Sequence, residues 1–223
     1  MWDFHFPCQT RPTGMSEPTV FLVDDDPSAR RGLSRLVRAA GMTAEPFASA
    51  GDFLASGRWD GPGCIVLDVQ MPDMTGPELQ EELCEAEYCM PIIFLSAHGD
   101  VPTTAQAMKK GAVDFLTKPV DADNLLDAIR ASLAKDAENR ARRAEASLME
   151  EDLKGLSPRE YEVMTYVIAG MPNKNTATAL GISEETVKIH RRRVVQKLKL
   201  RSVAELVRFC EKAGIAPVEK QRK

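Results

Sequence analysis

The stretch TVFLVDDDPSARRGL, residues 19–33, decides the fold of the first part of the chain. Four apolar residues, VFLV, run straight into three consecutive aspartates, and a proline and a helix-like segment follow. Short apolar strands that alternate with helices are typical of a parallel sheet covered on both faces. Three adjacent carboxylates repel one another, so the stretch also predicts that a positive charge lies among them.

The same alternation of short apolar runs and amphipathic stretches continues to about residue 135. The strand-like runs cover residues 20–23, 64–69, 92–97 and 113–117, with a weaker run at 42–46. The helix-like stretches cover residues 27–40, 49–56, 76–86, 103–110 and 123–134. Five such units predict an α/β domain with a doubly wound, five-stranded parallel sheet. In sheets of this kind, ligands bind beyond the carboxyl ends of the strands.

Polar residues stand at the carboxyl ends of the predicted strands. They are Asp24, Asp25, Asp68, Ser96 and Lys118. We expect all five side chains to project at one edge of the sheet. A cluster of carboxylates suits a hard divalent cation, most simply Mg²⁺. The metal is then the positive charge that makes the adjacent aspartates tolerable.

This predicted cluster also fits phosphoryl transfer. A carboxylate such as that of Asp68 can act as the nucleophile on a phosphoryl group. Mg²⁺ and the ammonium group of Lys118 would neutralise the charge that builds on the transferring oxygens. Ser96 would donate a hydrogen bond to the phosphoryl group on Asp68.

The rest of the chain predicts helices alone. Residues 134–154 contain no Pro or Gly and are rich in Ala, Glu and Arg, which favours a helical linker. Its thin apolar face leaves open whether the linker pairs in a dimer, packs on the first domain or is a solvated connector. Four short helices follow between Leu156 and about Ala213. Their start signals are Ser157 with Pro158 and Glu160, Ser183, and Ser202, and their stop signals are Gly170, Gly181 and Gly214.

The helix predicted from Glu184 to Lys197 is strongly basic. Its apolar residues recur at helical spacing and are expected to face the domain core; they are Val187, Val194, Val195 and Leu198. The opposite face then presents Lys188, Arg191 and Arg192 outward. Together with the preceding helix, this pattern indicates a helix-turn-helix whose basic helix enters the major groove of DNA. Such binding weakens as the salt concentration rises.

Charge and composition divide the chain in the same place. The net charge of −4 is unevenly distributed along the chain. From residue 155 onward there are 14 Lys and Arg against 7 Asp and Glu, whereas residues 1–154 contain 15 Lys and Arg against 26 Asp and Glu. A basic C-terminal part indicates a nucleic-acid partner. Five cysteines without metal-site spacing indicate reduced thiols. No apolar run suits a membrane span or a signal peptide, so we expect a cytoplasmic protein; whether Met1 or Met15 is the true start stays open.

With MPDMTG after Asp68 and KP at the end of the last strand unit, the five residues at the strand ends resemble the receiver domain of two-component response regulators. The resemblance covers about residues 19–135, and SAHGDVPTTAQAMKKGAVDFLTKP is similar to the FixJ-like subgroup. It implies that Asp68 is phosphorylated and that Ser96 and Phe115 move on phosphorylation. The implied metal ligands are Asp25, Asp68 and the backbone carbonyl of Gln70, with Asp24 acting indirectly. Ser96 stands where Thr is commoner, and Phe115 where some relatives have Tyr.

Residues 155–210 resemble a LuxR/FixJ-type DNA-binding domain. The markers are SPRE.EV, G.PNK.TA..LGIS..TVK.H and KL..RS..ELV, where dots stand for other residues. The resemblance implies that Lys188, Ile189 and Arg192 read bases. The residues implied to contact the DNA backbone are Lys174, Thr176, Thr186, His190 and Arg193.

Together these features predict a transcriptional regulator, by resemblance an activator, that a sensor histidine kinase phosphorylates on Asp68. The expected partners are promoter DNA, a second copy of the phosphorylated chain and RNA polymerase, with no membrane. The expected domains are a disordered tail (1–18), a receiver (19–135), a helical linker (136–154), a helix-turn-helix domain (155–214) and a tail (215–223).

Two other classes of protein share some of these features. A phosphohydrolase of the haloacid-dehalogenase-like type needs a second Asp two residues after the nucleophile, and this chain has Gln70 there. We therefore expect a switch and not an enzyme. A constitutive or ligand-gated regulator with a vestigial receiver is the other alternative, and the intact set of five residues argues against it.

Overall fold

A computed structural model describes residues 17–97, 105 and 107–218. The chain divides into two compact units, with the boundary in the sequence between Arg140 and Ala141. Each unit is described by itself. Most of both predicted tails, and residues 103, 104 and 106 of the predicted helix 103–110, lie outside the described residues. The domain limits given above stay predictions.

The first unit contains a five-stranded sheet in the order β2-β1-β3-β4-β5, and every neighbouring pair is parallel. The strands are β1 (Thr19–Val23), β2 (Thr43–Phe47), β3 (Gly63–Asp68), β4 (Ile92–Ser96) and β5 (Asp114–Thr117). Strands β1, β3 and β4 are buried along their whole length, as central parallel strands are. The predicted fold class is confirmed, and the weak run near residue 42 forms the edge strand β2.

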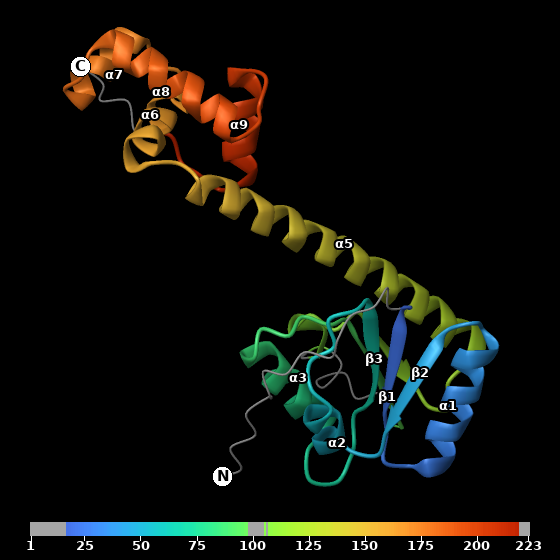
Figure 1. Cartoon of the computed structure of the whole chain (residues 1–223). Coiled ribbons are helices and arrows are strands. Elements are labelled where there is room, and N and C mark those ends of the chain that lie inside the picture. Colours follow the sequence, from blue (N-terminus) through green and yellow to red (C-terminus); the bar gives the residue numbers. More distant parts are fainter. Residues whose placement is uncertain (1–16, 98–104, 106, 219–223) are drawn as a thin grey trace. The chain divides into compact units, whose positions relative to one another are not determined.

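Helices cover both faces of this sheet (Figure 1). They are α1 (Pro27–Ala39), α2 (Ala50–Ala55), α3 (Gly76–Glu85) and α5 (Ala122–Lys154). Alternate residues of β1 face opposite sides, so Val20 and Leu22 pack with residues of α1 and α5, whereas Phe21 and Val23 pack with residues of α2 and α3. Each fully buried side chain of this size contributes about 1.5–3 kcal/mol to stability.

Helix α5 is one continuous helix of 33 residues, which includes both the last predicted helix of the receiver and the predicted helical linker. Within it, residues from Leu125 to Asp136 are buried at helical spacing. The buried carboxylate of Asp136 accepts a hydrogen bond of 3.1 Å from the backbone amide of Gly63, and Arg140 pairs with Asp60 at 3.7 Å. These contacts hold α5 against the segment that enters β3. From Ala141 to Leu148 the helix is exposed all round, including its apolar face.

The second unit contains four short helices after the end of α5. They are α6 (Pro158–Ile168), α7 (Asn173–Leu180), α8 (Glu184–Lys197) and α9 (Val203–Lys212). Three predicted N-caps are confirmed, because the hydroxyl oxygens of Ser157, Ser183 and Ser202 each accept a hydrogen bond from the backbone amide three residues later. Gly181 ends α7 in a left-handed conformation, φ 65°, which glycine adopts without steric cost. The helices enclose one core that includes Met164, Val187 and Leu206.

Candidate functional site

Two buried carboxylates and one lysine meet at the carboxyl edge of the sheet. Asp24 lies just after β1 and Asp68 ends β3, and they are 1% and 7% exposed. The ammonium group of Lys118 lies 2.7 Å from Asp24 and 2.8 Å from Asp68. Lys118 therefore bridges both acids and supplies positive charge inside the cluster. A positive charge at this place is what the run of three aspartates predicted.

Backbone groups fix the position of these acids. The amide of Asp26 donates to Asp24 Oδ1 at 2.9 Å, and the amide of Gln70 donates to Asp68 Oδ1 at 3.4 Å. The guanidinium of Arg30 on α1 donates to the backbone carbonyl of Asp24. No sequence pattern predicts this contact of Arg30, because it depends on how α1 folds back on the end of β1.

Opposing effects set the protonation of the cluster. Burial raises the pKa of Asp68, and the neighbouring Asp24 adds to this, whereas the hydrogen bond and charge of Lys118 lower it. Burial lowers the pKa of Lys118, but the hydrogen bonds that its ammonium group donates to Asp24 and Asp68, together with their negative charges, outweigh this effect and raise the pKa overall. Lys118 therefore stays charged between the two acids, and the cluster holds a permanent cation.

The acidic cluster has the donors that a hard cation requires. Asp24, Asp25 and Asp68 each offer an oxygen, and these oxygens all lie within 4.8 Å of one another. Asp25 is exposed, so the cluster opens to solvent on one side. Carboxylate oxygens around an open position fit Mg²⁺, which keeps several of its waters. The carbonyl of Gln70 stays a predicted third ligand beside Asp25 and Asp68, and the indirect role of Asp24 also stays a prediction.

The two predicted switch residues lie on neighbouring strands. Ser96 is the last residue of β4 and is buried, and its carbonyl accepts a hydrogen bond of 2.7 Å from the amide of Lys118. Phe115 on β5 is half-buried and packs against Phe94, with the ring centres 6.2 Å apart. The structure thus places both residues beside the strand end that carries Lys118, and their movement stays a prediction.

Helix α8 presents most of the residues predicted to contact DNA. Lys188, Ile189, Arg192 and Arg193 are exposed on it, and Lys174 is exposed on α7. Thr186 and His190 are half-buried. Lys188 and Arg192 are four residues apart and share one face of the helix.

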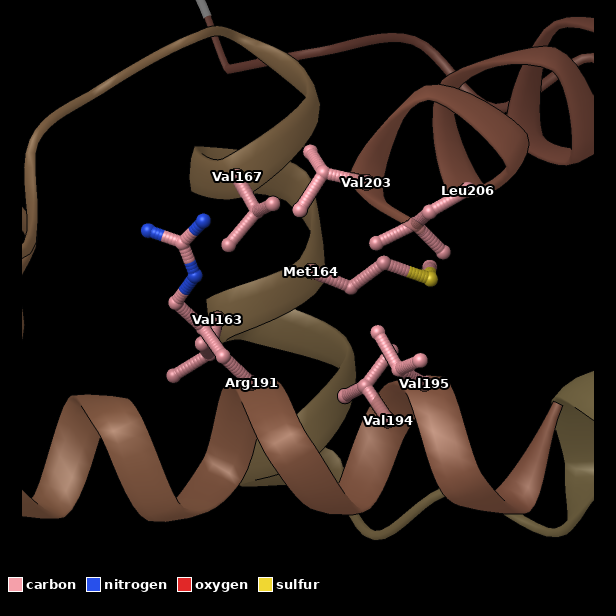
Figure 2. A pocket seen from close by; sticks show the side chains of 8 residues that line it. All are labelled: Val163, Met164, Val167, Arg191, Val194, Val195, Val203 and Leu206. Carbon is pink, nitrogen blue, oxygen red and sulfur yellow. The ribbon is translucent and has the colours of Figure 1, made fainter. Parts of the chain in front are cut away.

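Two expectations for this unit do not fit the structure. Arg191 was expected to point outward, but it is half-buried, donates to Asn173 and lines a cavity of about 20 Å³ between α6, α8 and α9 (Figure 2). The reason is that position 191 lies four residues after Val187 and three before Val194, on the apolar face. Thr176 is 1% exposed, and its hydroxyl donates to the carbonyl of Pro172 at 3.2 Å. We therefore drop Thr176 from the proposed DNA contacts.

Comparison with known proteins assigns both units. The family described as "Response regulator receiver domain" matches residues 20–130, and the family described as "Bacterial regulatory proteins, luxR family" matches residues 154–210. The chain belongs to the response regulators with a LuxR-type DNA-binding domain. Within the described part of this regulator, no helix is both long enough and apolar enough to cross a membrane.

Relatives match the regulator over nearly its full length. It is 43% identical over 209 residues to the response regulator protein TodT of Pseudomonas putida, covering 93% of this chain and 92% of TodT. It is 37% identical to the transcriptional regulatory protein FixJ of Rhizobium meliloti (strain 1021), covering 91% and 100%. The solved structure of the response regulator StyR matches with 47% identity and a TM-score of 0.79, covering 88% and 100%.

The buried acid Glu160 predicts a pH dependence of the DNA-binding unit. Lys197, 2.7 Å away, and the backbone amide of Ser157 lower the pKa of Glu160 to about 2. A carboxylate with a lowered pKa stabilises the fold above its unfolded pKa near 4.5, and this stabilisation disappears as the pH falls towards 2. We expect the unfolding free energy of wild type to exceed that of Glu160→Gln by about 1 kcal/mol at pH 6. The difference is no larger because Lys197 is exposed and solvent screens its charge. At pH 3 the difference should be much smaller.

Urea unfolding of the intact chain, followed by the amide NMR signals of α6 and α8, measures this difference. Glu162→Gln is the matched control, because Glu162 lies on the same helix and is half exposed. A gap between wild type and Glu160→Gln that stays constant from pH 6 to pH 3 would contradict the prediction.

Proposed function

We propose that this regulator is a cytoplasmic transcriptional activator of a two-component system, switched by phosphorylation of Asp68. The observation that carries the proposal is the cluster at the sheet edge, where Lys118 bridges Asp24 and Asp68 and Asp25 completes a set of metal-binding oxygens. The donor is the phosphohistidine of a sensor kinase. The phosphorylated chains dimerise, bind promoter DNA and recruit RNA polymerase.

The chain's own residues account for the transfer step. A carboxylate oxygen of Asp68 forms the new bond to phosphorus, and the bond between phosphorus and the donor nitrogen breaks, with the electron pair going to nitrogen. Lys118, already 2.8 Å from Asp68, holds the charge of the phosphoryl oxygens. Bound Mg²⁺, held by Asp25, Asp68 and the Gln70 carbonyl, would supply further positive charge there.

The fate of the phosphoryl group supports a switch. Gln70 stands two residues after Asp68, where hydrolases of the alternative class carry an acid, and an amide does not transfer protons in this role. The acyl phosphate then persists while Ser96 and Phe115 adjust to it. Ser96 donates to a phosphoryl oxygen, and Phe115 fills the space beside β4 that this movement leaves.

The proposal is tested with purified protein, Mg²⁺ and acetyl phosphate. Intact mass and sedimentation are compared for wild type and Asp68→Asn. We expect wild type alone to gain the mass of one phosphoryl group and to shift towards a dimer. Absence of the adduct in folded wild type would favour the vestigial-receiver alternative, and a transient adduct with continuous phosphate release would favour a hydrolase.

Arg192 and Arg193 on α8 have different proposed roles, since Arg192 contacts bases and Arg193 contacts the DNA backbone. We expect Arg192→Ala to weaken binding to a selected DNA site by about tenfold and to relax the preference at one position. We expect Arg193→Ala to weaken binding equally to all sequences and to lower the salt dependence by about one released ion. Fluorescence anisotropy at several salt concentrations, on DNA that wild type selects from a random pool, measures both effects. The assignment is wrong if the two variants respond alike.

A further inference from the structure

Helix α1 carries four arginines although it belongs to the acidic half of the chain. Arg30, Arg31, Arg35 and Arg38 recur on it at helical spacing, and no acidic residue lies between Pro27 and Ala39. Residues spaced by three or four share one helix face. Helix α1 lies beside the edge strand β2 (Figure 1).

A groove of about 320 Å³ runs along this face. Its lining consists of Pro27, Arg30, Arg31, Ser34, Arg35 and Arg38 from α1 and Pro46 from β2. No acidic side chain is among these lining residues. The volume falls at the lower end of the range for sites that bind small molecules.

The positive charge of the groove is uncompensated. Within residues 17–97, 105 and 107–218, none of the four arginines forms an ion pair with a carboxylate. Arg30 and Arg38 are anchored to the backbone carbonyls of Asp24 and Ala44, and Arg31 donates to the hydroxyl of Ser28. Four like charges along one helix face destabilise it, because like charges four residues apart repel. Such a cluster gains stability when an anion binds.

Ser34 gives a second, independent indication of a ligand. It lines the groove and is 8% exposed, and its hydroxyl is buried without a hydrogen-bond partner in the described structure. A buried hydroxyl that makes no hydrogen bond costs stability, so native proteins rarely leave one without a reason. A ligand oxygen beside Ser34 would satisfy it.

We propose that the groove between α1 and β2 binds a small anion that carries two or more phosphate groups. The planar guanidinium donates two parallel hydrogen bonds to phosphate, and the hydroxyl of Ser34 supplies a neutral donor between the arginines. The four guanidinium groups carry more positive charge than one phosphate group would neutralise, which favours an anion with at least two phosphate groups. Asp68 is not among the lining residues, and the site does not depend on the proposed phosphotransfer.

Isothermal titration calorimetry with inorganic pyrophosphate tests the site in the full-length protein. Metal-free buffer is used so that the acidic cluster repels the probe, and NMR locates the binding by shifts at residues 27–38 and 46. We expect saturable binding of one pyrophosphate per chain. Arg35→Ala should weaken pyrophosphate binding by at least about tenfold. Arg35→Lys should weaken it by less, because lysine keeps the positive charge but cannot donate the two parallel hydrogen bonds of a guanidinium group.

Ser34→Ala separates a ligand contact from a structural role. We expect it to weaken pyrophosphate binding about threefold or more while leaving the thermal midpoint of the free protein unchanged or higher, because an unpartnered hydroxyl is removed. Asp68→Asn and the α8 double variant Arg192→Ala, Arg193→Ala should bind as wild type does.

Three results would overturn the proposal. Binding that does not saturate at millimolar pyrophosphate excludes the site. Binding that Arg35→Ala leaves unchanged, but that the α8 double variant abolishes, places the anion on the DNA-binding helix. If an acidic peptide shifts the NMR signals of residues 27–38 and 46 and pyrophosphate does not, the groove is a protein-docking surface.

Discussion

Replacing Lys118 by Met is expected to lower the unfolding free energy of the receiver by about 3 kcal/mol in metal-free buffer, because it leaves two buried carboxylates without their shared cation. In wild type the ammonium group lies 2.7 Å from Asp24 and 2.8 Å from Asp68. Methionine has a similar length and no charge, so the change removes the ion pairs and keeps most of the packing. Repulsion between Asp24 and Asp68 is then no longer offset.

Urea unfolding with and without Mg²⁺ measures this effect. A Trp2→Phe background makes Trp59, which packs against the core of the first unit, the fluorescent reporter. Mg²⁺ should stabilise Lys118→Met more than wild type, because it then supplies the only cation in the cluster. Lys135→Met is the matched control, since Lys135 is exposed on α5. A loss below about 1 kcal/mol, typical of a surface ion pair, would show that the bridge is not structural.

A methyl group at Gly76 is expected to lower the unfolding free energy by roughly 3 kcal/mol, near the upper end for overpacking. A Cβ built there would lie 2.4 Å from the backbone oxygen of Asp68 and 3.0 Å from the ring of Phe94. Neither group can retreat easily, because Asp68 ends the central strand β3 and Phe94 is fully buried. The glycine of MPDMTG therefore lets α3 begin directly against the strand that ends in Asp68.

Gly32→Ala is the control for Gly76→Ala. Gly32 lies within α1, and a Cβ there would meet no atom within 4 Å. Alanine favours the helix, so this variant should gain about 0.5–1 kcal/mol. We expect Gly76→Ala also to slow the gain of phosphoryl mass with acetyl phosphate, because the clash displaces Asp68. Equal stability of the two variants in urea would refute the argument.

Sequence patterns predicted most of the acidic cluster because parallel topology is enough to assemble it. Once the short apolar runs are identified as parallel strands, Asp24, Asp68 and Lys118 must end at the same edge. The helix starts in the DNA-binding unit were predictable for a similar reason, since the capping of α6 by Ser157 and Glu160 involves residues three apart.

Contacts between residues far apart in the sequence could not be predicted from these patterns. Arg191 looks like another surface cation in the sequence, yet helix phase and the packing of α6 against α8 turn it inward. Asp136 looked like part of a linker, and the amide of Gly63, 73 residues earlier, makes it an anchor.

The sequence by itself determined the strands, the helix caps, the set of acids and the basic helix, because each depends on neighbours within a few residues or on the parallel order of the strands. The tertiary structure decided which charges are paired and which are not. Lys118 lies between two acids, whereas the arginines of α1 face a groove with no acid. That difference arises from packing, which sets the distances between charges and therefore their energies.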